Sequence, residues 1–195
     1  MRTDPIVSGA ELRDEPATPE VLSSDVVYRG AVWSVREDRV RYGDGELVRQ
    51  YTDHTGAVAV VALDDEERVL LIQQYRHPIR QRDWELPAGL LDVAGEDPVE
   101  AARRELAEEA DLVAEDWSEL VSTWTTPGGN SEMIRIYLAR GVSATEQVFE
   151  REAEEADIRR VWVPLTDAVT GVLEGRLRNG ILSIGVLAAE RRLRA

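Results

Sequence analysis

Residues 89–112 of this chain read GLLDVAGEDPVEAARRELAEEADL, and this stretch decides the fold. Asp97 is placed to cap a helix that begins at Pro98, since an aspartate side chain accepts from free N–H groups and proline is tolerated at the first helical position. Apolar residues then recur at helical spacing, at Val99, Ala102, Leu106 and Ala110. The pattern predicts a helix with one buried face.

Three glutamates, Glu105, Glu108 and Glu109, follow one another beside that apolar stripe. Like charges one helical turn apart repel, and Arg104 offsets only part of the cost. One interpretation is a solvated acidic face, the usual meaning of a charge run. The other is a site for hard divalent cations, because Mg²⁺ prefers oxygen ligands and carboxylates one turn apart can share an ion. The helix alone leaves both open.

The spacing of these residues resembles the signature of the Nudix hydrolases, the Nudix box. Glu96 is followed after seven residues by Arg104-Glu105-Leu106-Ala107-Glu108-Glu109. The chain departs from the family pattern twice: the loop from Gly89 to Glu96 is one residue longer, and Asp111 stands where the family has glycine. We expect Asp111 to adopt the left-handed conformation at the helix end, which aspartate tolerates better than most residues.

The resemblance implies a set of metal ligands. It assigns this role to Glu105 and Glu109, with Glu108 and the backbone carbonyl of Ala88 contributing, and the ion implied is Mg²⁺, with Mn²⁺ as the alternative. Arg104 resembles the arginine that orients the glutamates of the box and, with Glu108, joins the candidate catalytic residues.

Composition excludes several classes of function. The 195 residues carry a formal charge of −15, which argues against a nucleic-acid partner because such proteins need a basic face. The chain has no cysteine and no lysine, so disulfides, thiol nucleophiles and Schiff bases are excluded. No apolar run reaches the length of a membrane span and no signal-peptide pattern is present, so we expect a cytoplasmic protein without a membrane partner.

The rest of the chain predicts three parts: a polar arm over residues 1–24, a β hairpin unit over 25–54 and a main domain over 55–195. The hairpin is too small to hold a core alone and must pack on something. In the main domain we expect strands over 57–63, 68–75, 120–124, 133–138 and 161–163, and helices over 167–173 and 182–192. This is a mixed α/β pattern, and the resemblance implies an α/β/α sandwich with a mixed sheet.

A finer resemblance is to the ADP-ribose pyrophosphatase group of this family. It is carried by residues 74–77, 84–89, 126–129 and 154–157, which read QYRH, WELPAG, TPGG and EEAD. It implies Mg²⁺-dependent hydrolysis of the diphosphate of ADP-ribose to AMP and ribose 5-phosphate. It also implies a homodimer in which the N-terminal strands reach across to the partner.

The same resemblance assigns further residues. The late acidic loop would supply the general base, Glu155 by position and Glu154 as second choice, although such a loop by itself could serve only solubility. Arg76 would bind phosphate or ribose, for which a guanidinium is suited, unless it forms a surface ion pair with Glu85 or another neighbour. The remaining substrate-binding candidates are Glu85, Trp33, Arg49 and Gly129. For Glu85 a structural role, and for Trp33 burial in a core, are the alternatives.

Other functions stay open at this point. The nearest is hydrolysis of another nucleoside diphosphate derivative, such as a nucleotide sugar or a dinucleotide. A different class is a catalytically silent module that senses such ligands, against which the intact Glu105-Glu108-Glu109 cluster argues. The sequence leaves open the physiological substrate, the phosphorus attacked, and the preferred metal and number of ions.

Overall fold

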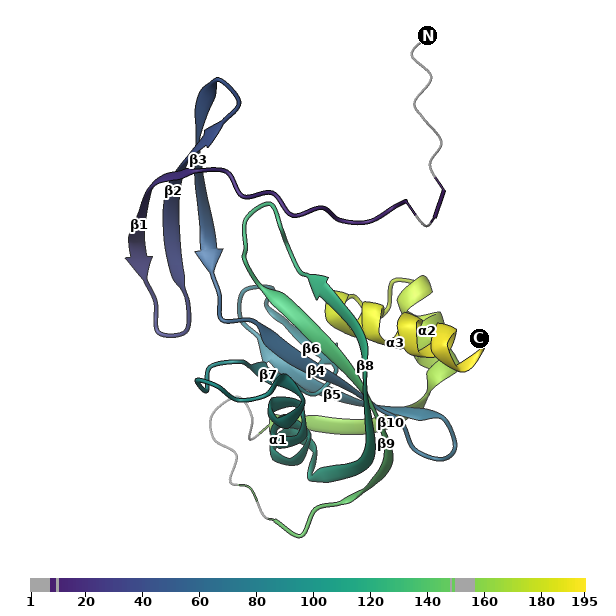
Figure 1. Ribbon diagram of the computed structural model, residues 1–195. Helices are drawn as coiled ribbons and strands as arrows, with labels where there is room; N and C mark the ends of the chain where they lie inside the picture. Colours follow the sequence, from purple (N-terminus) through teal and green to yellow (C-terminus); the bar gives the residue numbers. More distant parts are fainter. Residues whose placement is uncertain (1–7, 10, 148, 150–156) are drawn as a thin grey trace.

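The computed structural model describes residues 8–9, 11–147, 149 and 157–195, and Figure 1 shows a layered body with a separate N-terminal sheet. The central sheet has four strands in the order β7-β4-β9-β8. β4 and β9 run parallel and the other pairs run antiparallel, so the sheet is mixed. Its strands are β7 (Ala88–Leu90), β4 (Ala57–Ala62), β9 (Met133–Ala144) and β8 (Leu112–Trp124).

A second sheet of three antiparallel strands lies beside the first, in the order β10-β5-β6. It consists of β10 (Arg159–Pro164), β5 (Arg68–Arg76) and β6 (Gln81–Glu85). The described residues also form three helices: α1 (Pro98–Ala110), α2 (Leu165–Leu173) and α3 (Gly180–Leu193). No helix in the described part of the chain is long and apolar enough to cross a membrane.

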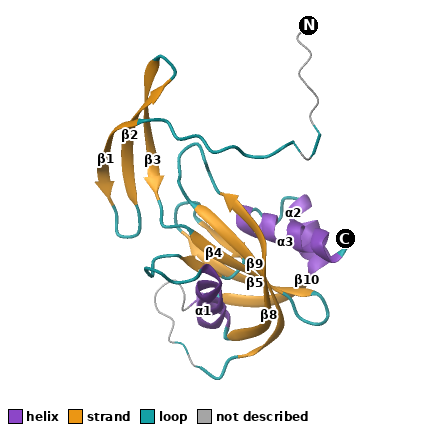
Figure 2. Cartoon of the chain, in the orientation of Figure 1, coloured by secondary structure: helices purple, strands orange, loops and turns teal. Residues whose placement is uncertain are grey.

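The buried strand β4 divides the core into two layers. Its side chains alternate between the faces of the sheet, so Val58 and Val60 pack with Leu106 of α1, whereas Ala59 and Val61 pack in the cluster that includes α2 and α3. Both faces are covered, which is why the strand reads as one continuous apolar run. Figure 2 shows α1 on one side of the sheet and the other two helices on the opposite side. The predicted α/β/α sandwich with a mixed sheet is confirmed.

The N-terminal unit differs from the expected hairpin. It is an antiparallel sheet of three strands, β1 (Val21–Arg29), β2 (Ser34–Tyr42) and β3 (Gly45–Asp53). The first strand of the expected hairpin is instead divided into β1 and β2 by a turn, in which Gly30 donates its N–H to the carbonyl of Trp33 at 2.9 Å. A β-carbon at residue 30 would lie 2.7 Å from that oxygen, so the turn needs glycine there. β1 also begins inside the segment expected to be a loose arm.

The region between β5 and α1 is also more regular than expected. No strand was predicted around Arg80 and Arg82, but this segment forms a hairpin, with β6 paired antiparallel to β5. Arg80 takes a positive φ of 53° in its turn. β6 has the sequence QRDWE and lies at the edge of its sheet. Its residues lack the alternation of apolar and polar side chains that predicts a half-buried strand, so this strand was not predicted.

Candidate active site

Helix α1 begins and ends as its sequence predicts. The Asp97 side chain accepts a hydrogen bond of 3.0 Å from the N–H of Val99, and Pro98 is the first helical residue. At the other end Asp111 has φ 58° and ψ 36°, and its N–H donates to the carbonyl of Ala107 at 3.0 Å. The expectation that this aspartate adopts the left-handed conformation is confirmed. These two ends fix the length of the helix that carries the glutamates.

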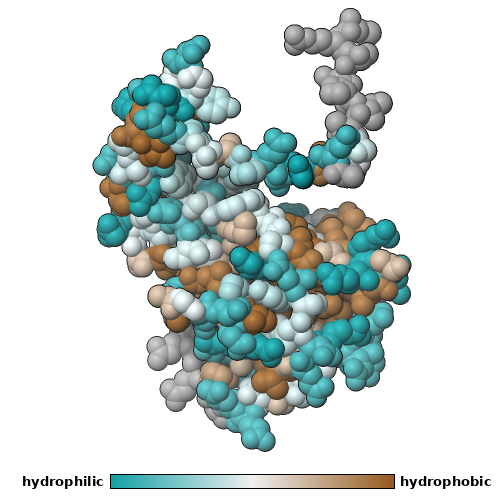
Figure 3. Space-filling model, in the orientation of Figure 1, coloured by the Kyte–Doolittle hydropathy of each residue, from teal (hydrophilic) through white to brown (hydrophobic). Residues whose placement is uncertain are grey.

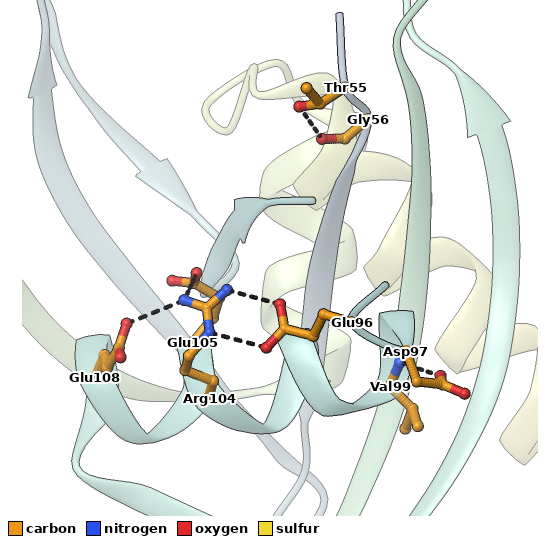
Figure 4. Close-up of polar contacts among 8 residues, drawn as sticks. All are labelled: Thr55, Gly56, Glu96, Asp97, Val99, Arg104, Glu105 and Glu108. Carbon is orange, nitrogen blue, oxygen red and sulfur yellow. Dashed lines mark hydrogen bonds and ion pairs between the residues drawn. The ribbon is translucent and has the colours of Figure 1, made fainter. Parts of the chain in front are cut away.

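Arg104 joins three of the acidic side chains, as Figure 4 shows. Its Nε and Nη2 donate to the two carboxylate oxygens of Glu96 at 3.2 and 3.1 Å. Its Nη1 donates to Glu105 at 2.6 Å and to Glu108 at 3.3 Å. The hydrogen bonds with Glu96 and the negative charge of Glu105 raise the pKa of Arg104 further, so the guanidinium stays charged throughout the physiological range.

Two glutamates of α1 lie against strand β7. Glu109 is only 8% exposed, and its Oε2 accepts a hydrogen bond of 2.8 Å from the N–H of Ala88. The Glu105 carboxylate lies over Gly89, where a β-carbon would come within 2.0 Å of the carboxyl carbon. The fold therefore brings together the residues that were predicted to be metal ligands. Ala88, Glu105 and Glu109 lie close to one another, and Glu108 is joined to Glu105 through Arg104.

Each of these carboxylates is hydrogen-bonded to another group of the protein. Among the described residues, no three histidine, cysteine, aspartate or glutamate side chains are grouped so that they could hold a metal ion. The physical reason is that Arg104 Nη1 bonds to both Glu105 and Glu108, while Glu109 turns to a backbone N–H. The donor set itself is all oxygen, which fits a hard divalent cation.

A cavity of about 560 Å³ opens beside Ala88 and Gly89. Arg76 and Glu85 face each other across the β5–β6 hairpin in its wall, joined by two hydrogen bonds of 2.7 Å. Arg76 therefore forms the ion pair with Glu85 that was the alternative interpretation. The pair lies in the wall of the cavity. Glu85 is 5% exposed, so this pair is partly withdrawn from solvent. Trp33, from the N-terminal turn, lines the same cavity while remaining partly exposed.

Two of the predicted substrate-binding residues are not brought to this cavity. Arg49 is exposed on β3, where its Nη1 donates to the carbonyl of Val48 at 2.9 Å. Gly129 accepts from the N–H of Thr52 at 2.9 Å and does not line the cavity. Glu155, with its alternative Glu154, lies outside the described residues.

The structure adds a histidine and a carboxylate that sequence reasoning missed. His54 Nε2 lies 3.5 Å from Glu132 Oε1, and both residues line the cavity. The Nδ1 of His54 accepts from the N–H of Gly56 at 3.1 Å, while Glu132 Oε2 accepts from the hydroxyl of Thr125 at 2.8 Å. No sequence signal marks either residue, because only the parallel pairing of β4 with β9 brings the segments together.

Asn179, at the start of α3, is another cavity residue that was not predicted from the sequence. Its side-chain oxygen accepts from the N–H groups of Ile181 and Leu182, both at 3.0 Å, and its amide donates to Asp83 at 3.1 Å. Asp83 and Asn179 both line the cavity, so this contact joins β6 to the helix across its wall. Asparagine before a helix is a readable cap signal, but its contact with β6 depends on the tertiary fold.

Known proteins resemble this chain over most of its length. The model of the NUDIX domain family matches residues 53–181. The chain is 45% identical over 170 residues to an ADP-ribose pyrophosphatase of Mycobacterium tuberculosis, covering 87% of this chain and 82% of that protein. It is 32% identical over 168 residues to a methanol dehydrogenase activator of Bacillus methanolicus, covering 86% and 90%. A crystal structure of an ADP compounds hydrolase has the same fold, with a TM-score of 0.76 at 23% identity over 93% of this chain and 97% of that one.

Proposed function

Because this chain belongs to the Nudix family, we propose that it is a hydrolase of the diphosphate bond of ADP-ribose, giving AMP and ribose 5-phosphate. The observation that carries the proposal is the meeting of two glutamates of α1 with Ala88 and Gly89, beside a cavity that also presents Arg76. Its choice of substrate is supported by the 45% identity to an ADP-ribose pyrophosphatase along most of the chain.

In this proposal Glu105, Glu108 and Glu109, with the carbonyl of Ala88, hold Mg²⁺, for which Mn²⁺ is the alternative. A bound ion of this kind lowers the pKa of water and neutralises charge on a diphosphate. Arg104 keeps the glutamates oriented through its bonds to two of them and to Glu96.

Arg76 supplies the cation for the phosphate end of the substrate. Its guanidinium lies in the cavity wall and is held in one direction by two hydrogen bonds to Glu85. A fixed planar guanidinium can bind phosphate oxygens with little loss of side-chain entropy. Trp33 offers a flat apolar surface in the same wall, which suits a base or ribose. Arg49 and Gly129 stay sequence-based candidates for substrate contacts.

The general base is proposed on sequence grounds alone. Glu155 lies in the acidic loop that resembles the base-bearing loop of the ADP-ribose pyrophosphatase group, and Glu154 is the neighbouring alternative. The glutamates of α1 would be engaged with the ion and are poor proton acceptors. A base must therefore come from elsewhere.

We also propose that the protein is a homodimer built partly from the N-terminal sheet. Within the three fully described strands β1 to β3, no residue is buried. Val27, Tyr28 and Tyr42 are each more than half exposed, and Figure 3 shows hydrophobic residues at the surface in this part of the molecule. A three-stranded sheet without a second layer gains stability by packing on another surface. A second copy of this chain supplies one.

The test is a panel of substrates: ADP-ribose, a nucleotide sugar and a dinucleotide, each incubated with the full chain and Mg²⁺. We expect kcat/KM for ADP-ribose to exceed the others by at least about tenfold, with AMP and ribose 5-phosphate identified by phosphorus NMR. A higher value for another member would establish the alternative substrate. Binding of ADP-ribose without turnover of any member would establish a sensor instead.

The expected cytoplasmic location stays a prediction, which cell fractionation tests.

A further inference from the structure

The last turn of α1 is electrostatically unfavourable. Glu108 and Glu109 lie there, and the turn contains no basic residue. The C-terminal end of a helix carries a partial negative charge from its unpaired carbonyl groups, so two carboxylates in that turn weaken it. The end is followed by Asp111, a third acidic residue, in the left-handed conformation. Arg104 of the same helix bonds to Glu108, and a cation from elsewhere in the fold can offset the remaining charge.

Arg160 of β10 supplies that cation. Its Nη1 donates to the carbonyl of Ala110 at 2.7 Å and also to the Asp111 carboxylate. One guanidinium thus satisfies a carbonyl at the helix end and also offsets the negative charge of Asp111. The backbone of Arg160 is fixed in its own sheet, where it is paired with the fully buried Ile72 of β5. The end of α1 is therefore tied to a strand of the second sheet.

This contact is next to a metal-ligand candidate. Glu109 immediately precedes Ala110, and its buried carboxylate reaches Ala88 across to β7. Because the helix is rigid, holding the Ala110 carbonyl also fixes the position of Glu109. We propose that Arg160 is a positioning residue, which holds the last turn of α1 so that Glu109 is set for a divalent cation. This inference rests on the metal site of the proposed function.

The competing account is an ordinary surface ion pair, since Arg160 and Asp111 are each 37% exposed and such pairs contribute little. The two accounts differ in what the arginine affects. A surface pair changes stability alone, whereas a positioning residue changes the affinity of the site. Arg68 offers a matched control, because it lies at the other end of the same ladder and forms a comparable pair with Asp64.

The experiment measures binding of Mn²⁺ alone to the full chain by electron paramagnetic resonance, without substrate. We expect Arg160→Ala to raise the dissociation constant about tenfold, the lower end of the effect of losing a group that orients a metal ligand. Arg160→Lys should restore part of the affinity, because an ammonium can still donate to the carbonyl. Arg68→Ala should bind Mn²⁺ as the wild type does, and thermal melts followed by circular dichroism give the stability of each variant.

Mn²⁺ binding by Arg160→Ala that equals the wild type would overturn the inference. An equal loss in Arg68→Ala would also overturn it, since the effect would then be one of general stability. ADP-ribose turnover by the wild type, measured in parallel, separates this result from the fate of the proposed function. A wild type that binds Mn²⁺ but leaves ADP-ribose intact would refute that substrate while the comparison of variants still tests Arg160. A wild type that binds no Mn²⁺ would overturn both.

Discussion

The Glu105 carboxylate lies directly over the α-carbon of Gly89, in the space that a side chain would otherwise fill. A β-carbon at residue 89 would meet the Glu105 carboxyl carbon at 2.0 Å and its Oε1 at 2.1 Å. A side chain at residue 89 would therefore displace the Glu105 carboxylate. The backbone itself does not require glycine there, because Gly89 is not among the residues with a positive φ. The glycine of β7 and the glutamate of α1 thus lie in contact, and the carboxylate is next to Gly89, which lines the cavity.

Gly89→Ala should displace Glu105 and lower kcat by about 100-fold, the scale expected when a catalytic group is misplaced by about 1 Å. The measurement is the steady-state hydrolysis of ADP-ribose at saturating substrate. Gly45→Ala is the control, because a β-carbon there meets only one atom within 4 Å, at 4.0 Å. Equal activity of the two variants would show that the position of Glu105 does not matter for turnover.

The sequence predicted the parts of the fold whose signals are local. The run of β4 is apolar at every position because both faces are covered, and the helix after Asp97 is marked by its cap, its proline and its stripe. The turn at Gly30 and the strand β6 were missed. β1 and β2 bury no side chain and β6 is a polar edge strand, so these elements lack the alternation that marks a half-buried strand.

The candidate site was predictable only in part, for a similar reason. The glutamates of α1 are close in sequence and carry a recognisable spacing. His54 and Glu132 are each isolated among polar neighbours, and their meeting depends on the pairing of strands that are far apart in the chain. The engagement of Glu105 and Glu108 by one nitrogen of Arg104 also depends on side-chain directions that spacing does not give.

Arg76→Ala should act mainly on substrate binding. We expect KM for ADP-ribose to rise by about 10- to 100-fold, the scale of a lost charge-assisted hydrogen bond, with a smaller change in kcat. Arg135→Ala is the control, since Arg135 is a half-exposed arginine that does not line the cavity and whose Nη1 lies 3.7 Å from Glu119. A KM that stays at the wild-type value would limit Arg76 to its structural bond with Glu85.

Glu155→Gln should leave folding and metal affinity nearly intact and lower kcat by about 10²- to 10⁴-fold, as expected for a lost general base. Glu154→Gln is the neighbouring control and should be far milder. Stopped-flow or steady-state turnover at saturating substrate distinguishes them. If Glu154→Gln is the damaging change, the base is one residue earlier; if neither lowers turnover, the base lies outside this loop.

Light scattering at micromolar concentration should give twice the chain mass of 21.8 kDa. Replacing Val27 and Tyr28 together by aspartate should produce monomers with reduced activity, because it places two charges on the exposed sheet. Leu173→Asp is the control, a residue on α2 that is 74% exposed. A wild-type monomer with full activity would refute the dimer.

The central claim is that carboxylates of α1 support metal-dependent hydrolysis of ADP-ribose. The most direct measurement follows AMP release as Mg²⁺ is returned to chelator-treated protein, for the wild type, Glu109→Gln and Glu100→Gln. Glu100 is the control, an exposed glutamate in the first turn of the same helix, 3.3 Å from Arg103. The account predicts that activity vanishes with chelator, returns with Mg²⁺ in the wild type and in Glu100→Gln, and stays lower by orders of magnitude in Glu109→Gln. Undiminished AMP release in excess chelator, or a wild-type response from Glu109→Gln, would contradict it.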